Sequence, residues 1–176
     1  RQHSDGPIFC RYPRGEGEGV DITDIVQDVK IGKGRIIKTG KDLAILALGT
    51  RVGSALKVAD HLLLYNLKIT VADARFAKPI DTELLEKLWN DHEKLIIIEE
   101  GSAGGFSSHC LHYLSSKNLL NKHDKEIKCL TMPDYFQDHA SQNEQLAKAG
   151  LDTDGLMKVV SQMLSLSNEK NNSVAN

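Results

Sequence analysis

The sequence predicts an α/β fold with three layers, in which helices cover both faces of a mostly parallel sheet with one antiparallel edge strand. The first observation is that short apolar segments alternate with segments whose apolar residues recur at helical spacing, from residue 42 to residue 166. The second is that Leu43–Leu48 is continuously apolar, as expected of a strand buried on both faces. Strand–helix alternation at this spacing favours parallel strands joined by crossover helices.

Composition excludes several classes of protein. The 176 residues contain 22 Lys and Arg against 24 Asp and Glu, and this near balance argues against a general nucleic-acid binder. A hydrophobic content of 40% argues against wholesale disorder. The longest apolar runs are far too short to cross a bilayer. The three cysteines are far apart and form no CxxC pair, which favours a reducing compartment.

The N-terminal region reads differently from the rest. Residues 7–12 fit a buried strand that ends at Pro13, because proline cannot donate to a ladder. Residues 15–32 are rich in glycine and acidic residues, which is typical of a surface linker. The chain begins at Arg1 rather than Met, and we interpret it as a fragment of a longer protein.

The regular elements follow in order from residue 34. Residues 34–38 and 42–48 are predicted to form an antiparallel hairpin that turns at Gly40. A helix over 51–65 comes next, then a strand over 68–72 and a helix that opens at Pro79 and is capped by Asp81. The remaining segments are a strand over 95–98, a helix over 106–116, a strand over 127–132, and helices over 141–149 and 152–166.

The cluster of greatest chemical interest is Arg11-Tyr12-Pro13-Arg14. Guanidinium groups bind phosphate through paired hydrogen bonds, and ligands of open α/β sheets lie at the carboxyl ends of strands. The alternative is a pair of exposed surface arginines. A second candidate is the loop over 99–105, whose amides, with the next helix N-terminus, would hold an anion. The two glutamates at the start of this loop are negatively charged and would repel an anion, so a structural turn is the favoured interpretation.

Other polar groups give weaker signals. His109 and His112 are three residues apart on a predicted helix, but the spacing supplies no third metal ligand. Asp138 and His139 are a candidate acid–base pair, with loop polar residues as the favoured alternative. Trp89 is expected to pack in the core or at an interface.

Several strings together resemble the 1-deoxy-D-xylulose-5-phosphate synthase family, and they run in that family's order over about residues 6 to 151. The combination is far more specific than any single string. The strings are Gly6-Pro7 with Arg11-Tyr12-Pro13-Arg14-Gly15, Ala74-Arg75-Phe76-Ala77-Lys78-Pro79-Ile80-Asp81, His92-Glu93 with Ile98-Glu99-Glu100-Gly101-Ser102-Ala103-Gly104-Gly105-Phe106 and His109, Pro133-Asp134-Tyr135-Phe136 with Asp138-His139, and Gln145-Leu146-Ala147-Lys148-Ala149-Gly150-Leu151. Ser107 and Ala140 depart from the pattern, since the family often has glycine at both positions.

The resemblance implies a thiamine-diphosphate enzyme related to transketolase, with three α/β domains, that works as a homodimer. The family condenses pyruvate with glyceraldehyde 3-phosphate, losing CO2, and its product feeds isoprenoid, thiamine and pyridoxal phosphate biosynthesis. Thiamine diphosphate and Mg²⁺ bind outside the region covered here. On this comparison, residues 1–15 end the pyrimidine-binding second domain, 16–31 are a linker, 32–166 form a transketolase-like C-terminal domain, and 167–176 are a disordered tail.

The resemblance carries over few site residues. It implies that Arg14 contacts the phosphate of glyceraldehyde 3-phosphate, with Arg11 and Tyr12 as second choices, and it implies no catalytic, cofactor-binding or metal-binding residue in this chain. The loop over 99–106 is interpreted as packing or subunit contact. Neither nucleic acid nor membrane is expected as a partner. The expected compartment is the bacterial cytoplasm, or alternatively a plastid-type organelle.

Two rival interpretations remain. One is the C-terminal domain of another thiamine-diphosphate enzyme, a transketolase or the β chain of a 2-oxo-acid dehydrogenase. The other is a binding domain with no chemistry of its own.

Overall fold

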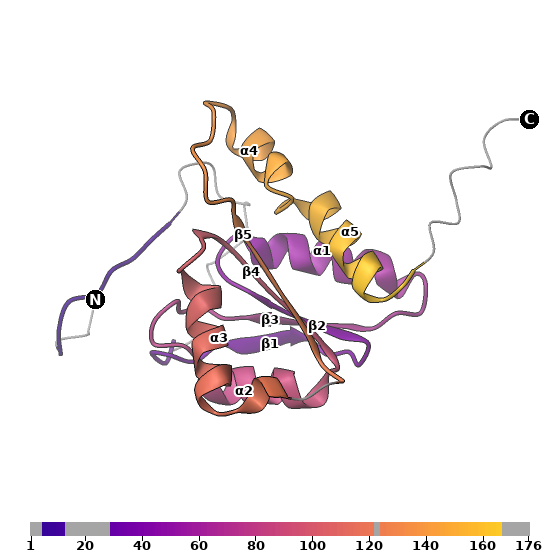
Figure 1. Ribbon diagram of the computed structural model, residues 1–176, viewed down its shortest axis with the longest axis horizontal. Coiled ribbons are helices and arrows are strands. Elements are labelled where there is room, and N and C mark those ends of the chain that lie inside the picture. The colour runs from indigo at the N-terminus through magenta and orange to yellow at the C-terminus, as the bar shows by residue number, and fades with distance from the viewer. Residues whose placement is uncertain (1–4, 13–28, 122–123, 167–176) are drawn as a thin grey trace, which may run out of the picture.

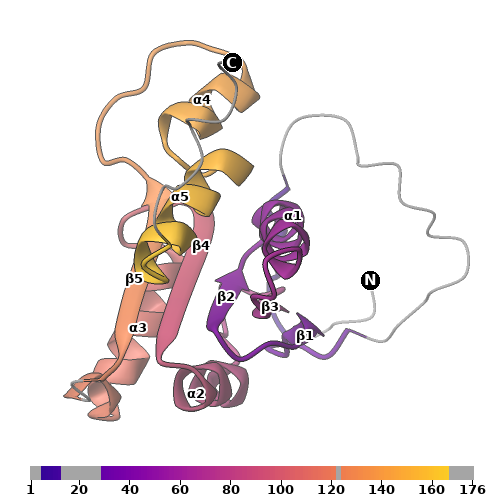
Figure 2. The ribbon, with the colours of Figure 1, turned by 90° about the vertical axis from the view of Figure 1, so that its right-hand side faces the viewer.

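The computed structural model describes residues 5–12, 29–121 and 124–166. In that part of the chain, five strands form one sheet in the order β1-β3-β2-β4-β5. β1 runs antiparallel to β3, and the other three pairs are parallel, so the predicted fold class is confirmed. Figure 2 shows the twisted sheet from β5 across to β1. The strands are β1 (Arg35–Lys38), β2 (Leu43–Ala47), β3 (Ile69–Asp73), β4 (Lys94–Ser102) and β5 (Glu126–Met132).

Helices cover both faces of the sheet. α1 (Arg51–Leu63) and α5 (Thr153–Met163) pack on one face, together with residues of α4 (Gln142–Lys148). α2 (Thr82–Asp91) and α3 (Phe106–Ser116) pack on the other, and a short 3-10 helix, η1 (Leu119–Asn121), follows α3 (Figure 1). All five residues of β2 are buried, and they alternate between the two cores. This explains why the strand is apolar at every position.

The predicted hairpin between 34–38 and 42–48 is wrong. β1 pairs with β3, placing Arg35 opposite Asp73, whereas β2 lies between β3 and β4. Because β3 and β4 occupy both edges of the fully buried β2, β1 cannot pair with β2, and it pairs with the outer edge of β3. At Gly40 the chain passes close to the backbone just before β3, because a Cβ at this position would overlap the backbone of Lys68.

The prediction of a buried strand over 7–12 is also wrong. These residues form no strand, and Phe9 is 95% exposed. A strand needs a neighbour to satisfy its backbone groups, and none of the described strands pairs with this segment. Residues 13–28 and 167–176 lie outside the described residues, so most of the proposed linker and the whole tail stay predictions.

The other elements follow the predictions closely. α3 covers 106–116 as predicted, and the Asp81 carboxylate caps α2 by accepting the Leu84 N–H at 3.1 Å. Trp89 is buried, and its indole N–H donates to the Leu119 carbonyl at 3.1 Å. One difference matters for the site: β4 does not end at Ile98 but continues to Ser102.

Candidate functional site

The candidate site lies at the carboxyl ends of β2 and β4. These neighbouring strands are followed by helices on opposite faces, α1 after β2 and α3 after β4. Adjacent strands whose connections leave in opposite directions form a topological switch point, where open α/β sheets place their ligands. The residues at this point are Thr50 and Arg51 after β2, and Glu99 and Glu100 in β4.

Glu99 is a buried carboxylate that caps α3. It is 2% exposed, and its two oxygens accept the backbone N–H groups of Phe106, at 3.1 Å, and Ser107, at 2.7 Å. The N-terminus of a helix carries unpaired amides and a partial positive charge, so it stabilises an anion. That anion is the protein's own side chain. The helix N-terminus that was predicted to help hold an external anion is therefore already occupied by Glu99, which favours the structural interpretation of this loop.

Two glycines make room for the Glu99 carboxylate. A Cβ at Gly101 would overlap its Oε2 atom, and one at Gly105 would lie 2.7 Å from the same atom. Neither position has a positive φ, so close approach rather than an unusual backbone conformation explains the glycines. The glycine-rich sequence after β4 thus builds a closed cap around a buried carboxylate.

Glu100 points to the other side of the strand, as successive residues of a strand do. Its carboxylate accepts the Thr50 hydroxyl hydrogen bond and lies 3.0 Å from Arg51 Nε. Arg51 is buried, and its Nη1 donates to the carbonyl of Leu151, just before α5, at 2.6 Å. Through Arg51, the ends of β2 and β4 are joined to the start of α5.

Sequence reasoning missed the role of Arg51. The only signal was an arginine at the first helical position after a buried strand, which is also an ordinary place for an exposed arginine. Its partner Leu151 is 100 residues away along the chain.

An open cleft of about 370 Å³ lies beside this network. Thr50, Arg51 and Lys57 line it from α1 and the turn before it, and Asp152 and Asp154 line it from α5. Asp152 caps α5 by accepting the Gly155 N–H at 2.8 Å. Cations and carboxylates face the same space, so the cleft does not select a ligand of one charge.

The predicted substrate-binding residues fall partly in this region. The guanidinium of Arg11 donates through Nη2 to the Glu100 carbonyl at 3.4 Å. Tyr12 is 83% exposed, and Arg14 lies outside the described residues. Arg11 is thus brought to the carboxyl end of β4. Substrate contacts by Arg14, Arg11 and Tyr12 stay predictions.

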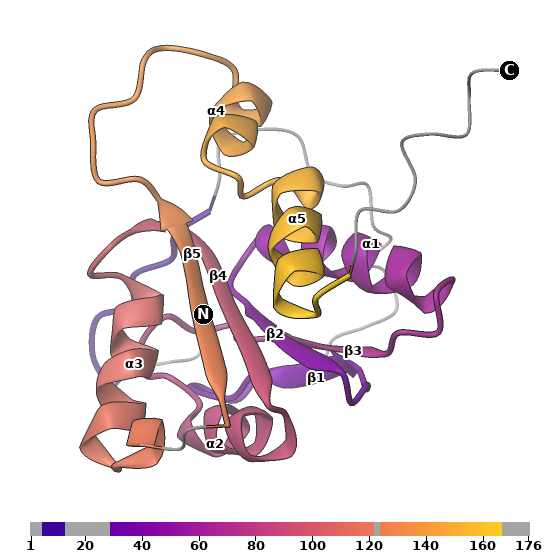
Figure 3. The same ribbon diagram turned by 45° about the vertical axis from the view of Figure 1, so that its right-hand side comes forward.

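The weaker candidates stay apart from this site. His109 and His112 are exposed on α3. Asp138 and His139 are exposed in the loop that arches from the end of β5 to α4 (Figure 3). Over residues 5–12, 29–121 and 124–166, no three His, Cys, Asp or Glu side chains are grouped to hold a metal ion. In the same ranges, no helix is long and apolar enough to span a bilayer.

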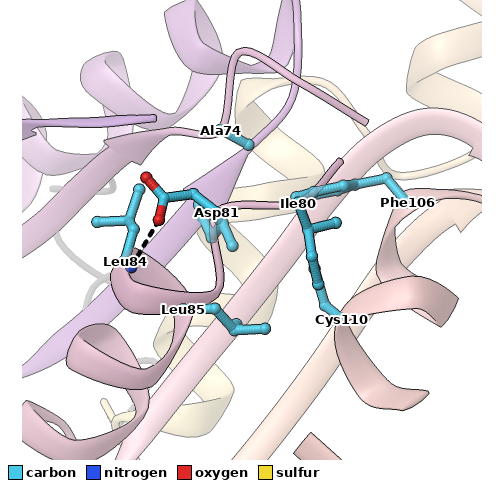
Figure 4. Close-up of a pocket in the computed structure, with 8 residues that line it drawn as sticks. Ala74, Ile80, Asp81, Leu84, Leu85, Phe106 and Cys110 are labelled. Atoms are coloured by element: carbon cyan, nitrogen blue, oxygen red, sulfur yellow. Dashed lines mark hydrogen bonds between the residues drawn. The ribbon is translucent and has the colours of Figure 1, made fainter. Parts of the chain in front are cut away.

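A second cavity lies where α2 and α3 pack against the sheet, and Figure 4 shows the residues that line it. Its volume is about 10 Å³, which admits at most one water molecule. Ala74, Ile80, Leu85 and Phe106 give it an apolar wall, and the Asp81 carboxylate turns toward Leu84 at its rim. This cavity is a small packing gap in the core.

Cys110 borders this cavity and is fully buried. Burial raises the pKa of its thiol to about 12, with smaller contributions from Cys129 and Glu99. Burial also raises the pKa of Cys129. A reactive cysteine needs a lowered pKa and access to solvent, so neither thiol has the environment of a nucleophile.

Comparison with known proteins identifies the domain. Residues 32–156 match the family model described as transketolase, C-terminal domain. A structure described as a split-gene transketolase, an inactive β4 tetramer, is 29% identical over 78% of this chain and 44% of its own, with a TM-score of 0.68. Transketolase from Campylobacter jejuni subsp. jejuni NCTC 11168 is 19% identical over 77% of this chain and 19% of its own, with a TM-score of 0.50, and shares the fold. The chain thus spans less than half the length of either protein. It belongs to the transketolase C-terminal domain family.

Proposed function

We propose that the chain is the C-terminal part of a 1-deoxy-D-xylulose-5-phosphate synthase. The whole enzyme would join pyruvate to glyceraldehyde 3-phosphate with release of CO2. One observation carries the proposal: two segments that resemble this family, 89 residues apart in the sequence, meet where Arg11 donates to the Glu100 carbonyl. The Arg-Tyr-Pro-Arg string therefore begins beside the glutamate–glycine loop of β4.

In this proposal Arg14 binds the phosphate of the acceptor substrate. A guanidinium offers two parallel N–H groups to phosphate oxygens, which fixes the orientation of the ligand as well as its position. Holding the phosphate at one end of glyceraldehyde 3-phosphate directs its aldehyde toward the reacting carbon of the donor. Binding energy remote from the reaction is thereby used for positioning. Arg11, which lies beside the carboxyl end of β4, and Tyr12 would support this site.

The transketolase family uses thiamine diphosphate and a divalent metal. When bound, the cofactor supplies the carbon that attacks the keto group of pyruvate. Over residues 5–12, 29–121 and 124–166, no His, Cys, Asp or Glu side chains form a cluster suited to a metal ion. As the family resemblance implies, we place the cofactor in other domains of the full protein, and in this proposal residues 32–166 serve to support the fold and the homodimer.

The second candidate is a transketolase, which would transfer a two-carbon ketol unit between sugar phosphates without loss of CO2. The similarity to the split-gene transketolase structure, at 29% identity and a TM-score of 0.68, favours it. Both candidates use phosphorylated aldehydes as acceptors. They differ in the donor substrate.

The donor substrate therefore decides between the two candidates. The full protein that contains this chain is supplied with thiamine diphosphate, Mg²⁺, glyceraldehyde 3-phosphate and either pyruvate or a ketose phosphate. With pyruvate as the donor we expect release of CO2 and formation of a five-carbon ketose phosphate, and with the ketose phosphate as the donor we expect no turnover. Turnover with the ketose phosphate and none with pyruvate would replace the synthase by the transketolase.

A further inference from the structure

The loop between β5 and α4 carries two exposed aromatic side chains. Phe136 is 100% exposed and its neighbour Tyr135 is 66% exposed. The loop arches away from the end of β5 before it reaches α4 (Figure 3). Exposed apolar side chains gathered in one place mark surfaces that bind another protein, and aromatic residues are enriched there. We call residues 133–141 the aromatic loop.

The tip of the aromatic loop also contains an unpaired amide. The Oε1 and Nε2 atoms of Gln137 are buried without a hydrogen-bond partner, and no other side chain in the described part of the chain has such atoms. An unpaired buried amide destabilises the conformation that contains it. The chain is tied down only beyond the tip, where Gln145 Nε2 donates to the Asp138 carbonyl at 3.2 Å and Ser141 caps α4. The tip is therefore a segment that a second surface would complete.

The aromatic loop is acidic. Asp134 and Asp138 are exposed, and within the described residues their carboxylates form no hydrogen bond or ion pair. No lysine or arginine occurs between Lys128 and Lys148. Protein surfaces that meet carry complementary charges. The surface that covers this loop should therefore combine apolar side chains with positive charge.

The chain itself has such a surface at the end of α1. Leu63, Leu64 and Tyr65 are 52%, 78% and 59% exposed. Lys68 follows them, and Lys41 lies beside it, because the Lys41 N–H donates to the Lys68 carbonyl at 2.9 Å. Both lysines are exposed, and neither ammonium group has an ion pair among the described residues. We call these five residues the α1-end patch.

Two carboxylates near the α1-end patch are engaged within the chain. Asp42 accepts the backbone N–H of Lys68 at 2.6 Å, and Asp60 pairs with Lys38. They leave the ammonium groups of Lys41 and Lys68 as the charges available to a partner. The aromatic loop and the α1-end patch are thus complementary both in charge and in their exposed apolar side chains.

The two surfaces lie at opposite edges of the sheet. The aromatic loop follows the carboxyl end of β5, whereas α1 starts at the carboxyl end of β2 and runs back toward the amino ends of the parallel strands. Its 13 residues alone span about 20 Å. Figures 1 and 3 show the separation. One copy of the chain therefore does not bring its own loop to its own patch.

Two copies related by a two-fold axis satisfy both surfaces. α1 and α4 lie on the same face of the sheet, since residues of both contribute to one core. When two such faces meet in opposite directions, the loop of each copy reaches the patch of the other. A two-fold pair of this kind makes every contact twice, and it closes without leaving a surface open for further growth.

We infer that two copies of the protein associate in this way, with the aromatic loop of each docked on the α1-end patch of the other. Phe136 packs against Leu64, and Asp134 and Asp138 face Lys68 and its neighbour in the patch. The contact removes exposed apolar area from water on both sides. The inference goes beyond the proposed function, because it does not depend on which donor substrate the enzyme uses.

The pair Phe136 and Leu64 tests the contact directly in the full protein. The exposed Cys10 is first replaced by serine. One copy then carries Phe136→Cys and the other Leu64→Cys, each with its own affinity tag, and the two are expressed together. After mild oxidation we expect a disulfide-linked species that carries both tags. Neither variant expressed alone should form a linked species, because each new thiol then faces an unsubstituted residue of the partner.

Phe136→Cys expressed with His109→Cys is the matched control. His109 is equally exposed but lies on α3, which packs on the other face of the sheet. We expect no linked species from this pair. Absence of a link between the cysteines at 136 and 64, or an equal yield from the control pair, would overturn the inference.

Charge reversal with rescue provides the second test. Asp134→Lys with Asp138→Lys, added to the linked pair, places like charges across the contact, and we expect the yield of linked species to fall about tenfold. Further addition of Lys41→Asp and Lys68→Asp restores opposite charges and should recover most of the yield. All four side chains are exposed, so the fold should tolerate the changes. A loss that the second pair of substitutions does not recover would contradict the assigned partner surface.

Hydroxyl-radical footprinting needs no cysteine. In the associated full protein, we expect oxidation of Phe136 and of Leu64 to be slowed severalfold together, and both to recover on dilution to the single copy. His109 should be oxidised at the same rate throughout. Protection of Phe136 without protection of Leu64 would assign the loop to a different surface, such as another domain of the enzyme, and would overturn the pairing of copies.

Discussion

The backbone N–H of Ser107 donates to Glu99 Oε1 at 2.7 Å, linking the end of β4 to the first turn of α3. The Phe106 N–H donates to the other oxygen of the same carboxylate. A residue of the preceding strand thus caps the helix, in place of the N-cap residue itself, which is Gly105 and has no side chain. The turn from strand to helix is built around this buried charge.

Removal of the Glu99 carboxylate should weaken the fold. Glu99→Ala leaves two buried N–H groups without their acceptor, and hydrogen bonds to charged groups contribute about 1.5–3 kcal/mol each. We expect the free energy of unfolding to fall by about 3 kcal/mol, measured by urea denaturation. The exposed Glu93, just before β4, provides the control: Glu93→Ala should change stability by less than about 0.5 kcal/mol. Equal effects of the two substitutions would contradict the capping role.

The glycines around Glu99 give a second prediction. Gly101→Ala would drive a methyl group into Glu99 Oε2, and overpacking at such a site costs about 1–3 kcal/mol. The neighbouring Ser102→Ala, at an exposed position, should be nearly neutral. In a Glu99→Ala background the Gly101→Ala cost should largely disappear. A full, additive cost there would show that something other than the carboxylate requires glycine.

Thiol reactivity gives a third prediction. Cys10 is exposed, whereas Cys110 is buried with its pKa raised to about 12. In the native protein at pH 8, iodoacetamide should modify Cys10 far faster than Cys110, as peptide mapping would show. Comparable rates at the two positions would contradict the packing of α3 against the sheet.

The same pKa predicts how stability depends on alkaline pH. The folded state keeps the Cys110 proton up to about pH 12, whereas the unfolded thiol loses it near the ordinary thiol pKa of 9.0. The contribution of the buried neutral thiol to the free energy of unfolding is therefore complete below pH 9. It is lost as the pH rises toward 12, by up to about 1.4 kcal/mol per pH unit. Cys110→Ala should flatten the decline of unfolding free energy between these values. An unchanged slope would argue against a buried neutral thiol.

Cofactor binding gives a fourth prediction. Calorimetric titration of thiamine diphosphate with Mg²⁺ into the 176-residue chain should show no binding, because the proposed function puts the cofactor site in other domains of the full protein. The full protein is the positive control. Tight binding to the chain alone would overturn this division of roles.

The fold was largely predictable because β2 is a continuous apolar run and the helices carry apolar residues at helical spacing. The predicted hairpin is wrong because the local turn signal at Gly40 does not reveal that β3 and β4 occupy both edges of β2. The pairing of strands far apart in the sequence determines where β1 lies, and sequence spacing does not encode that pairing directly.

The candidate site was less predictable. The burial of Glu99 and the ion pair of Glu100 follow from where β4 ends, since an extension of the strand to Ser102 sends the two side chains to opposite faces. The sequence predicted that the strand ends at Ile98. It therefore gave no reason to expect the side chains of the two glutamates on opposite faces of the sheet. Arg51 depends on a contact with Leu151 on another element, which no local pattern shows.

The central claim is that Arg14 anchors the phosphate of glyceraldehyde 3-phosphate. The most direct measurement is steady-state kinetics of Arg14→Ala, with Arg14→Lys beside it, in the full protein with pyruvate as donor. Hydrogen bonds to a charged group contribute about 1.5–3 kcal/mol, so we predict that Arg14→Ala raises the KM for glyceraldehyde 3-phosphate by about tenfold to a hundredfold. The KM for pyruvate should not change, and Arg14→Lys should recover part of the loss. An unchanged KM for glyceraldehyde 3-phosphate in Arg14→Ala would contradict the account.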